Sequence, residues 1–301
     1  MRISTQHLFD SGAARMGEIQ SSLAKTQQQV ATGRRILAPS DDPVAAARAL
    51  EVSQSQSINT QYGVNRGYAK DSLVTVDSTL ASVTELLQNV KTTAISAGNG
   101  SLGDSQRASI ATALQSSLGM LLGLANTRDG QGNYLFSGFQ TNTPAFSKDP
   151  VTNVVQYDGD QGQRMIQVDS ARQLAVSAPG QGVFQGGGQD MFQTLNALIT
   201  QLNTPGTVGL STALATANSN LELALSNVST VRASVGSRLQ ELDALNSAGD
   251  DRNLQYSQNL SDLQDLDYTK ALTQLSQQQT TLEAAQKSFA KIAGLSLFNY
   301  L

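Results

Sequence analysis

The chain has 301 residues with a formal net charge of −4, and it contains no cysteine and a single histidine. The absence of cysteine excludes disulfides, thiol nucleophiles and thiolate metal sites. The small negative charge provides no clustered basic surface of the kind that binds nucleic acid, so we expect no nucleic-acid partner. Hydrophobic residues make up 39% of the chain, which is sufficient for a packed core once its 25 glycines are included.

The histidine, His7, lies near the N-terminus beside Leu8 and Phe9, and we expect it to be solvated and not catalytic. With one histidine and no cysteine, a zinc site or a Ser-His-Asp triad would have few residues to draw on. We therefore predict no enzyme activity, no metal and no cofactor.

The N-terminal segment has neither the apolar core nor the small-residue cleavage site of a Sec signal peptide. No run of about 18 apolar residues predicts a membrane span. On these signals alone the chain would stay in the cytoplasm, so an extracellular location would require another export route.

The first predicted element is a helix over about the first thirty residues with one narrow apolar stripe. Its apolar residues repeat at intervals of seven with one more on the intermediate turn, and they are Met16, Leu23, Val30 and Ile19. Uncharged polar residues such as Gln27-Gln28-Gln29 cover the remaining faces. Such faces suit a helix that packs against many copies of itself, although an ordinary intramolecular helix pair is the alternative.

A loop with the sequence Ala-Pro-Ser-Asp-Asp-Pro follows this helix. Pro43 suits the first position of the next helix, and Asp42 suits its N-cap, where a carboxylate accepts backbone N–H groups. Asp41 and Asp42 lack the opposed geometry of an acid–base pair. Arg34 and Arg35 could pair with acidic groups of a neighbouring subunit or lie solvated in the turn.

Three later segments carry coiled-coil-like seams, in which apolar residues recur at steps of three and four. They cover residues 73–94, 110–125 and 214–245, and the last is interrupted only by Arg238. Because an apolar seam must be covered by another helix, we predict that these segments form one long bundle.

Residues 130–188 break the helical pattern with many glycines and with short β-prone runs at 134–136, 154–157 and 165–168. We predict a small β-rich insertion here, with Asp158-Gly159-Asp160-Gln161-Gly162 as a hairpin turn between two of the strands. Together with Asp169, the two aspartates also resemble a calcium loop weakly, but Gln163 occupies the place of the required glycine.

The last forty residues repeat the narrow stripe of the first thirty. Its apolar residues are Leu275, Leu282 and Phe289 at intervals of seven, with Leu272 and Ile292 alongside. One apolar residue in every three or four does not comfortably offset the conformational entropy of a lone helix pair. We therefore predict that both ends are mobile in the monomer and become ordered on assembly.

The segment from Gln29 to Val44 resembles the one that joins the N-terminal helix to the first core helix in flagellin-family proteins. Its Ala-Pro-Ser-Asp-Asp-Pro form is similar to that of the family's hook-filament junction members. Residues 132–146 resemble the segment that leads into the family's outer domain. The ending, residues 295–301, resembles that of the junction members more than that of filament flagellin.

The resemblance implies a mainly α fold, a long coiled-coil-like helical bundle built from both chain ends with a small β-rich domain inserted in the middle. Residues 1–40 with 265–301 would form a terminal assembly domain, and residues 41–133 with 189–264 the core of the bundle. Residues 134–188 would form the β-rich outer domain.

The resemblance also implies a structural subunit of the bacterial flagellum that joins the hook to the filament and is exported through the flagellar type III channel. The expected partners are the hook-side junction protein, flagellin, a ring of like subunits and a flagellar export chaperone. The two terminal stripes with Arg34 and Arg35 would form the assembly interface, and Asp42 with Pro43 the helix cap of the loop. Filament flagellin is the nearest alternative, and a soluble helical adaptor is a more distant one.

Overall fold

The computed structural model describes residues 2–298, and the chain divides into two compact units. The first unit comprises residues 1–58 and 251–301, and the second comprises residues 59–250. Two long helices, α2 (Pro43–Ala97) and α6 (Leu210–Gln264), contribute residues to both units. The three-domain division predicted from the sequence is a finer one and stays a prediction.

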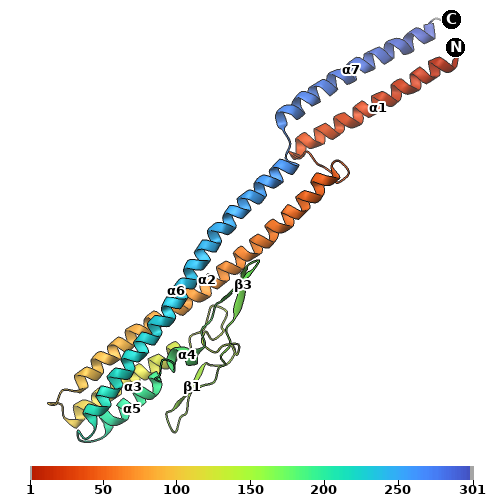
Figure 1. Cartoon of the computed structure of the whole chain (residues 1–301). Helices are drawn as coiled ribbons and strands as arrows, with labels where there is room; N and C mark the ends of the chain where they lie inside the picture. Colours follow the sequence, from red (N-terminus) through yellow and green to blue (C-terminus); the bar gives the residue numbers. More distant parts are fainter. Residues whose placement is uncertain (1, 299–301) are drawn as a thin grey trace. The chain divides into compact units, whose positions relative to one another are not determined.

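The second unit contains the hydrophobic core, which lies between helices. In this unit α3 (Asp104–Ala125) and α5 (Met191–Asn203) lie alongside parts of α2 and α6, and α3 packs along α5 (Figure 1). All the apolar residues of the predicted 73–94 seam are at most 1% exposed. The predicted seam over 214–245 is buried or partly buried at each of its apolar positions. The predicted mainly α fold is therefore confirmed.

Ion pairs between α2 and α6 follow the direction of the two helices. Lys70 pairs with Asp243 at 2.8 Å, and Lys91 pairs with Glu222 at 2.8 Å. Residue numbers rise along one helix as they fall along the other, so the helices are antiparallel. Exposed pairs of this kind contribute little stability, and the apolar seam carries most of the packing energy.

The strands form two small antiparallel sheets on one side of these helices (Figure 1). β1 (Phe146–Lys148) pairs with β2 (Val155–Tyr157), and β3 (Met165–Asp169) pairs with β4 (Arg172–Ala175). The predicted strands at 154–157 and 165–168 are confirmed. The predicted strand at 134–136 is wrong, because these buried residues are irregular and form only an isolated bridge between Arg128 and Tyr134.

Asp158–Gly162 is not a hairpin turn, which corrects a second prediction. The segment connects β2 to β3, which belong to different sheets, because each strand pairs with its other neighbour in the sequence. The Asp160 carboxylate accepts backbone N–H groups from Phe139 at 2.9 Å and from Gly162 at 2.7 Å. The aspartate thus holds the loop in place.

An aromatic cluster fastens the inserted strands to the helices. The ring of Phe146 on β1 lies 5.4 Å from Phe184 on α4 (Gly180–Phe184) and 5.0 Å from Phe192 on α5. Asn126, just after α3, exchanges hydrogen bonds with both backbone groups of Phe146, at 2.8 and 2.9 Å. Strand β1 is therefore tied to α4, to α5 and to the end of α3.

A buried arginine makes a second link between the helices and the strands. Arg66 on α2 is 2% exposed, and its guanidinium donates to Asn246 on α6 at 2.6 Å and to the Val168 carbonyl on β3 at 3.0 Å. A Cβ added at Gly249 would clash with the guanidinium. The glycine at 249 therefore leaves the space that the buried guanidinium occupies.

Within residues 2–298, α3 is the helix whose length and composition would suffice to cross a membrane, with 22 residues and a mean hydropathy of 1.4. Core helices of soluble proteins meet the same criteria. In α3 the residues Leu114, Leu118 and Leu121 are at most 2% exposed in the hydrophobic core. Its apolar character is accounted for by this burial.

Candidate assembly interface

The first and last helices pair along their length within the first unit. They are α1 (Arg2–Thr32) and α7 (Tyr268–Phe298), which lie side by side and antiparallel (Figure 1). The rings of Phe9 and Phe289 are 4.7 Å apart, and Gln278 donates to the Ser22 hydroxyl at 2.8 Å. These contacts join residues from the two ends of the sequence.

Most residues of the two predicted stripes lie in the seam between α1 and α7. They are partly buried there, and they are Met16, Ile19, Leu23, Val30, Leu275, Leu282 and Phe289. Leu272 lies off the seam and is 52% exposed, and the neighbouring Ala271 occupies the seam position. The side chain of Ile292 is outside the described residues. The stripes thus cover each other within one chain.

The terminal pair adds nothing to the hydrophobic core. Among the residues whose burial the structure describes, those of the core lie between Ala69 and Leu242. On the described parts of α1 and α7, the residues less than 9% exposed are Thr26 and Ala271, and both have small side chains. The pair therefore buries its larger apolar side chains only in part.

The loop after α1 is fixed by main-chain contacts with the segment before α7. Gly33 has φ +70°, a conformation that favours glycine, and a Cβ there would lie 2.9 Å from the Tyr268 hydroxyl. The Leu266 N–H donates to the Gly33 carbonyl at 3.0 Å, and Arg34 forms an antiparallel bridge with Asp265. Both connections of the helix pair are held together at this point.

The two arginines of the loop have different surroundings. Arg35 pairs with Asp42 at 3.2 Å and donates to the Leu263 carbonyl at 2.8 Å, so its guanidinium is used within the chain. The Arg34 side chain is exposed, and no acidic group in the described part of the chain pairs with it. Of the two, Arg34 is the one available to another molecule.

The two aspartates of the loop accept hydrogen bonds from the loop itself. Asp41 pairs with Lys25 at 2.6 Å and accepts the N–H groups of Leu37 and Ala38. Asp42 precedes α2, whose first residue is Pro43, and accepts the Ala45 N–H at 3.0 Å. The Lys25 hydrogen bond lowers the pKa of Asp41, and the Ala45 N–H followed by Arg35 lowers the pKa of Asp42.

Acid is expected to loosen this loop. Because each carboxyl has a folded pKa below its unfolded value of about 3.9, its contribution is complete above about pH 4 and is lost as the pH falls through the folded pKa. Hydrogen exchange of Leu37, Ala38 and Ala45, corrected for intrinsic rates, should show protection disappearing below that pH. The Asp41→Asn/Asp42→Asn variant keeps the acceptors without the titration, so an identical acid transition in this variant would contradict the assignment.

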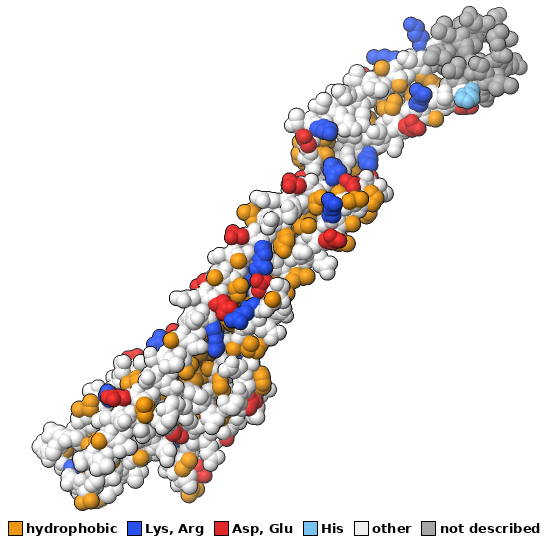
Figure 2. Space-filling model, in the orientation of Figure 1, with side chains coloured by type: hydrophobic (Ala, Val, Ile, Leu, Met, Phe, Trp, Pro, Cys, Tyr) orange, Lys and Arg blue, Asp and Glu red, His pale blue; other side chains and the backbone are white. Residues whose placement is uncertain are grey.

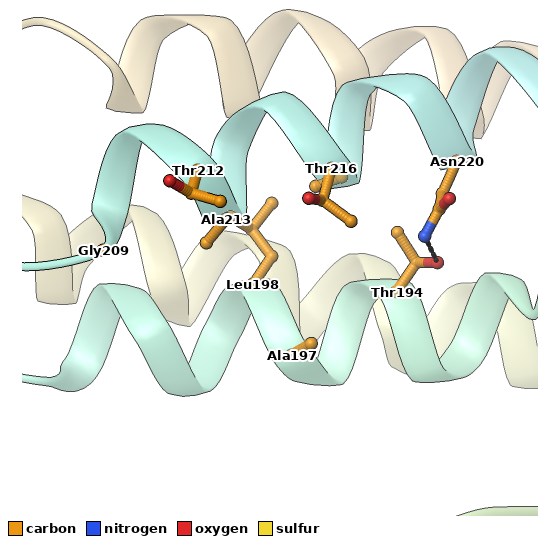
Figure 3. Close-up of a pocket in the computed structure, with 9 residues that line it drawn as sticks. Thr194, Ala197, Leu198, Gly209, Thr212, Ala213, Thr216 and Asn220 are labelled. Carbon is orange, nitrogen blue, oxygen red and sulfur yellow. Dashed lines mark hydrogen bonds between the residues drawn. The ribbon is translucent and has the colours of Figure 1, made fainter.

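The structure also has a groove away from the terminal helices. A groove of about 430 Å³ lies between α5 and α6, where Asn220 donates to Thr194 at 3.3 Å (Figure 3). Its lining consists of small, aliphatic and polar uncharged residues, with no charged group to orient a ligand. Among residues 2–298 no group of three or more His, Asp or Glu side chains is arranged to hold a metal ion, and His7 is exposed.

The chain aligns over its whole length with flagellar proteins. Residues 3–141 match the model of the bacterial flagellin N-terminal helical region. Over 317 aligned residues the chain is 36% identical to flagellar hook-associated protein 3 of Escherichia coli and 35% identical to that of Salmonella typhimurium, with 99% of the chain and of each relative covered. The chain belongs to the flagellar hook-associated protein 3 family.

A solved structure of hook-associated protein 3 from Legionella pneumophila has the same fold. It superimposes with a TM-score of 0.65 at 20% identity, and the match covers 70% of the chain and 98% of the Legionella protein. The predicted flagellin-family membership is confirmed, together with the β-rich insertion in the middle of the chain. The members of the hook-associated protein 3 family matched over the full length are structural components of the flagellum.

The sequence interpretation missed several residues of the seam in this hook-associated protein 3 family member. They are Gly12 and Thr26 on α1 and Ala271, Gln278 and Ala285 on α7. A signal for them existed, since the alternation of four and three steps continues through these positions. It was hidden because the residues there are small or polar.

Proposed function

We propose that the chain is a structural subunit at the junction between the flagellar hook and filament, and that it assembles through the α1–α7 pair. The full-length relationship to hook-associated proteins 3 carries the first part of the proposal. The position of the pair outside the hydrophobic core supports the second. A two-helix pair with partly buried residues gains stability when neighbouring subunits cover it.

In this proposal the pair acts as one element, because the apolar stripes are already used between its two helices. Neighbouring subunits would then meet the outward faces, which are mainly uncharged and polar (Figure 2). Phe9 at 51% exposure and Leu272 at 52% exposure add apolar contacts, and Arg34 adds a free guanidinium. Uncharged faces avoid repulsion between identical subunits in a ring.

The proposed partners are the hook-side junction protein, flagellin and further copies of this chain. Export through the flagellar type III channel with a dedicated chaperone completes the proposal, and a pair that folds late suits passage as an unfolded chain. The protein would act outside the cell as a structural subunit, in keeping with its full-length relationship to flagellar hook-associated proteins 3.

Electron microscopy tests the proposal directly. The purified chain should form no long filaments by itself at high concentration, but it should bind isolated hooks that carry the hook-side junction protein and allow added flagellin to elongate from them. A variant reduced to residues 43–264 lacks both helices of the pair and should not bind.

Two outcomes would contradict the proposal in different ways. Long filaments from the chain alone would identify a filament flagellin. Binding to hooks by the shortened variant would leave the function in place but remove the α1–α7 pair from the assembly interface.

A further inference from the structure

The seam between α1 and α7 consists of matched layers. The α1 positions, at alternating steps of four and three, are Gly12, Met16, Ile19, Leu23, Thr26 and Val30. The α7 positions, met in the opposite direction, are Phe289, Ala285, Leu282, Gln278, Leu275 and Ala271. At one end of the seam the large Phe289 side chain lies against Gly12.

Gly12 provides the space for the Phe289 ring. A Cβ at Gly12 would lie 3.1 Å from this ring. The ring also contacts Phe9, which lies on α1 like Gly12. Gly17 on α1 has no atom within 4 Å of an added Cβ. Of these two glycines, Gly12 is therefore the one whose lack of a side chain the packing uses, as a knob-into-hole contact requires.

Gln278 provides a polar layer in the middle of the seam. Its amide nitrogen donates to Ser22 at 2.8 Å, while its amide oxygen is buried without a hydrogen-bond partner among the described residues. The Thr26 hydroxyl donates to the Ser22 carbonyl of its own helix and adds no bond across the pair. A buried amide at a seam position lowers stability but discriminates between registers, because only one register supplies its partner.

We infer that Gly12 and Gln278 are specificity-determining residues that hold α1 and α7 in a single register. In a pair slipped by one heptad, Phe289 would face Ile19 in place of Gly12. Gln278 would then face Val30 and lose Ser22. The slipped pair is therefore penalised twice, by crowding at one layer and by an unpaired amide at another.

The register matters for assembly because it decides which outward residues lie next to each other on the pair. A slip of seven residues moves one helix by about 10 Å along the other. In this respect the inference rests on the proposed function, in which neighbouring subunits contact the outward faces of the pair.

Disulfide trapping tests the register, and the natural absence of cysteine makes the result unambiguous. The Thr26→Cys/Leu275→Cys variant reports the observed register, and Thr26→Cys/Leu282→Cys reports the slipped one. A disulfide needs Cα atoms roughly 4.4–6.8 Å apart, so each pair reports one register. Trapping also captures a pair that is open for most of the time.

The observed-register disulfide should form at least tenfold faster than the slipped one. Adding Gly12→Leu and Gln278→Leu together should reduce the ratio of the two trapping rates at least threefold. The leucine at position 12 crowds Phe289 in the observed register, and the leucine at position 278 removes the unpaired amide from the slipped register. Gly17→Leu is the matched control, since it adds the same side chain to α1 outside the seam, and it should leave the ratio unchanged.

A ratio within threefold of the parent in the Gly12→Leu/Gln278→Leu background would overturn the inference and leave the main-chain bridge between Arg34 and Asp265 as the determinant. An equal fall of the trapping ratio in the Gly17→Leu variant would overturn the inference as well. The measurement needs no flagellar partner, so its failure is distinguishable from a failure of the chain to bind hooks.

Discussion

In the isolated chain, the backbone amides of α1 and α7 are expected to exchange with solvent at least about 100-fold faster than those of residues 73–94 and 214–245. This ratio corresponds to about 2.7 kcal/mol between local opening of the pair and opening of the core. The seam residues of the pair are mostly only partly buried, whereas the 73–94 seam is at most 1% exposed. Less apolar area is lost when the pair opens, so opening costs less free energy.

Hydrogen–deuterium exchange with peptide-level mass spectrometry measures this difference. The same peptides should become protected after the chain binds hooks that carry the hook-side junction protein, while the core peptides keep their rates. Equal protection of α1, α7 and the core seams in the isolated chain would mean that the pair is ordered before assembly. The mechanism of ordering on assembly would then be wrong, although the family relationship would stand.

The Phe146→Ala variant is expected to lose about 3–5 kcal/mol of unfolding free energy, the usual cost of removing a buried aromatic ring. Phe146 is 1% exposed, and its ring contacts Phe184, Phe192 and Tyr157 at centroid distances of 5.0–5.4 Å. Its loss opens a cavity between the inserted strands and α5. The midpoint of a domain of this size shifts by about 2–4 °C per kcal/mol, so the thermal midpoint should fall by about 6–20 °C.

Phe139→Ala is the matched control, because it removes the same ring from a position that is 65% exposed. Its effect should stay below about 1 kcal/mol. Both variants can be compared by thermal unfolding followed by circular dichroism. Similar midpoints for the two variants would show that the aromatic cluster does not stabilise the insertion, and that the helical seams alone determine the transition.

The helices of the core could be predicted from the sequence because large apolar residues mark every step of their seams. Leu80 and Leu87 are examples, and both are fully buried. The strands were predicted in part, since β-prone runs indicate extended segments but not their partners. Asp158–Gly162 was misinterpreted for this reason, because the pairing of β2 with β1 depends on contacts that the local sequence does not show.

The candidate interface was predicted only through its larger apolar residues. Gly12 and Ala285 gave no hydrophobic signal, and Gln278 has the composition of an exposed position, although the seam places all three between the helices. Arg66 was not recognised because arginine is rarely buried. Its burial depends on Gly249, which lies on another helix far away in the sequence. Such pairings are set by tertiary contacts and leave no periodic pattern.

The pairing of the first helix with the last one also sets an order of events. When a chain leaves a narrow channel from one end to the other, α1 and α7 cannot meet until nearly all of the sequence between them has passed. A contact between residues so distant in sequence forms late in folding. An interrupted or shortened chain would therefore carry an unmatched terminal helix. Under the proposed assembly through the α1–α7 pair, only a chain that has been translated and exported completely would present both helices to its neighbours.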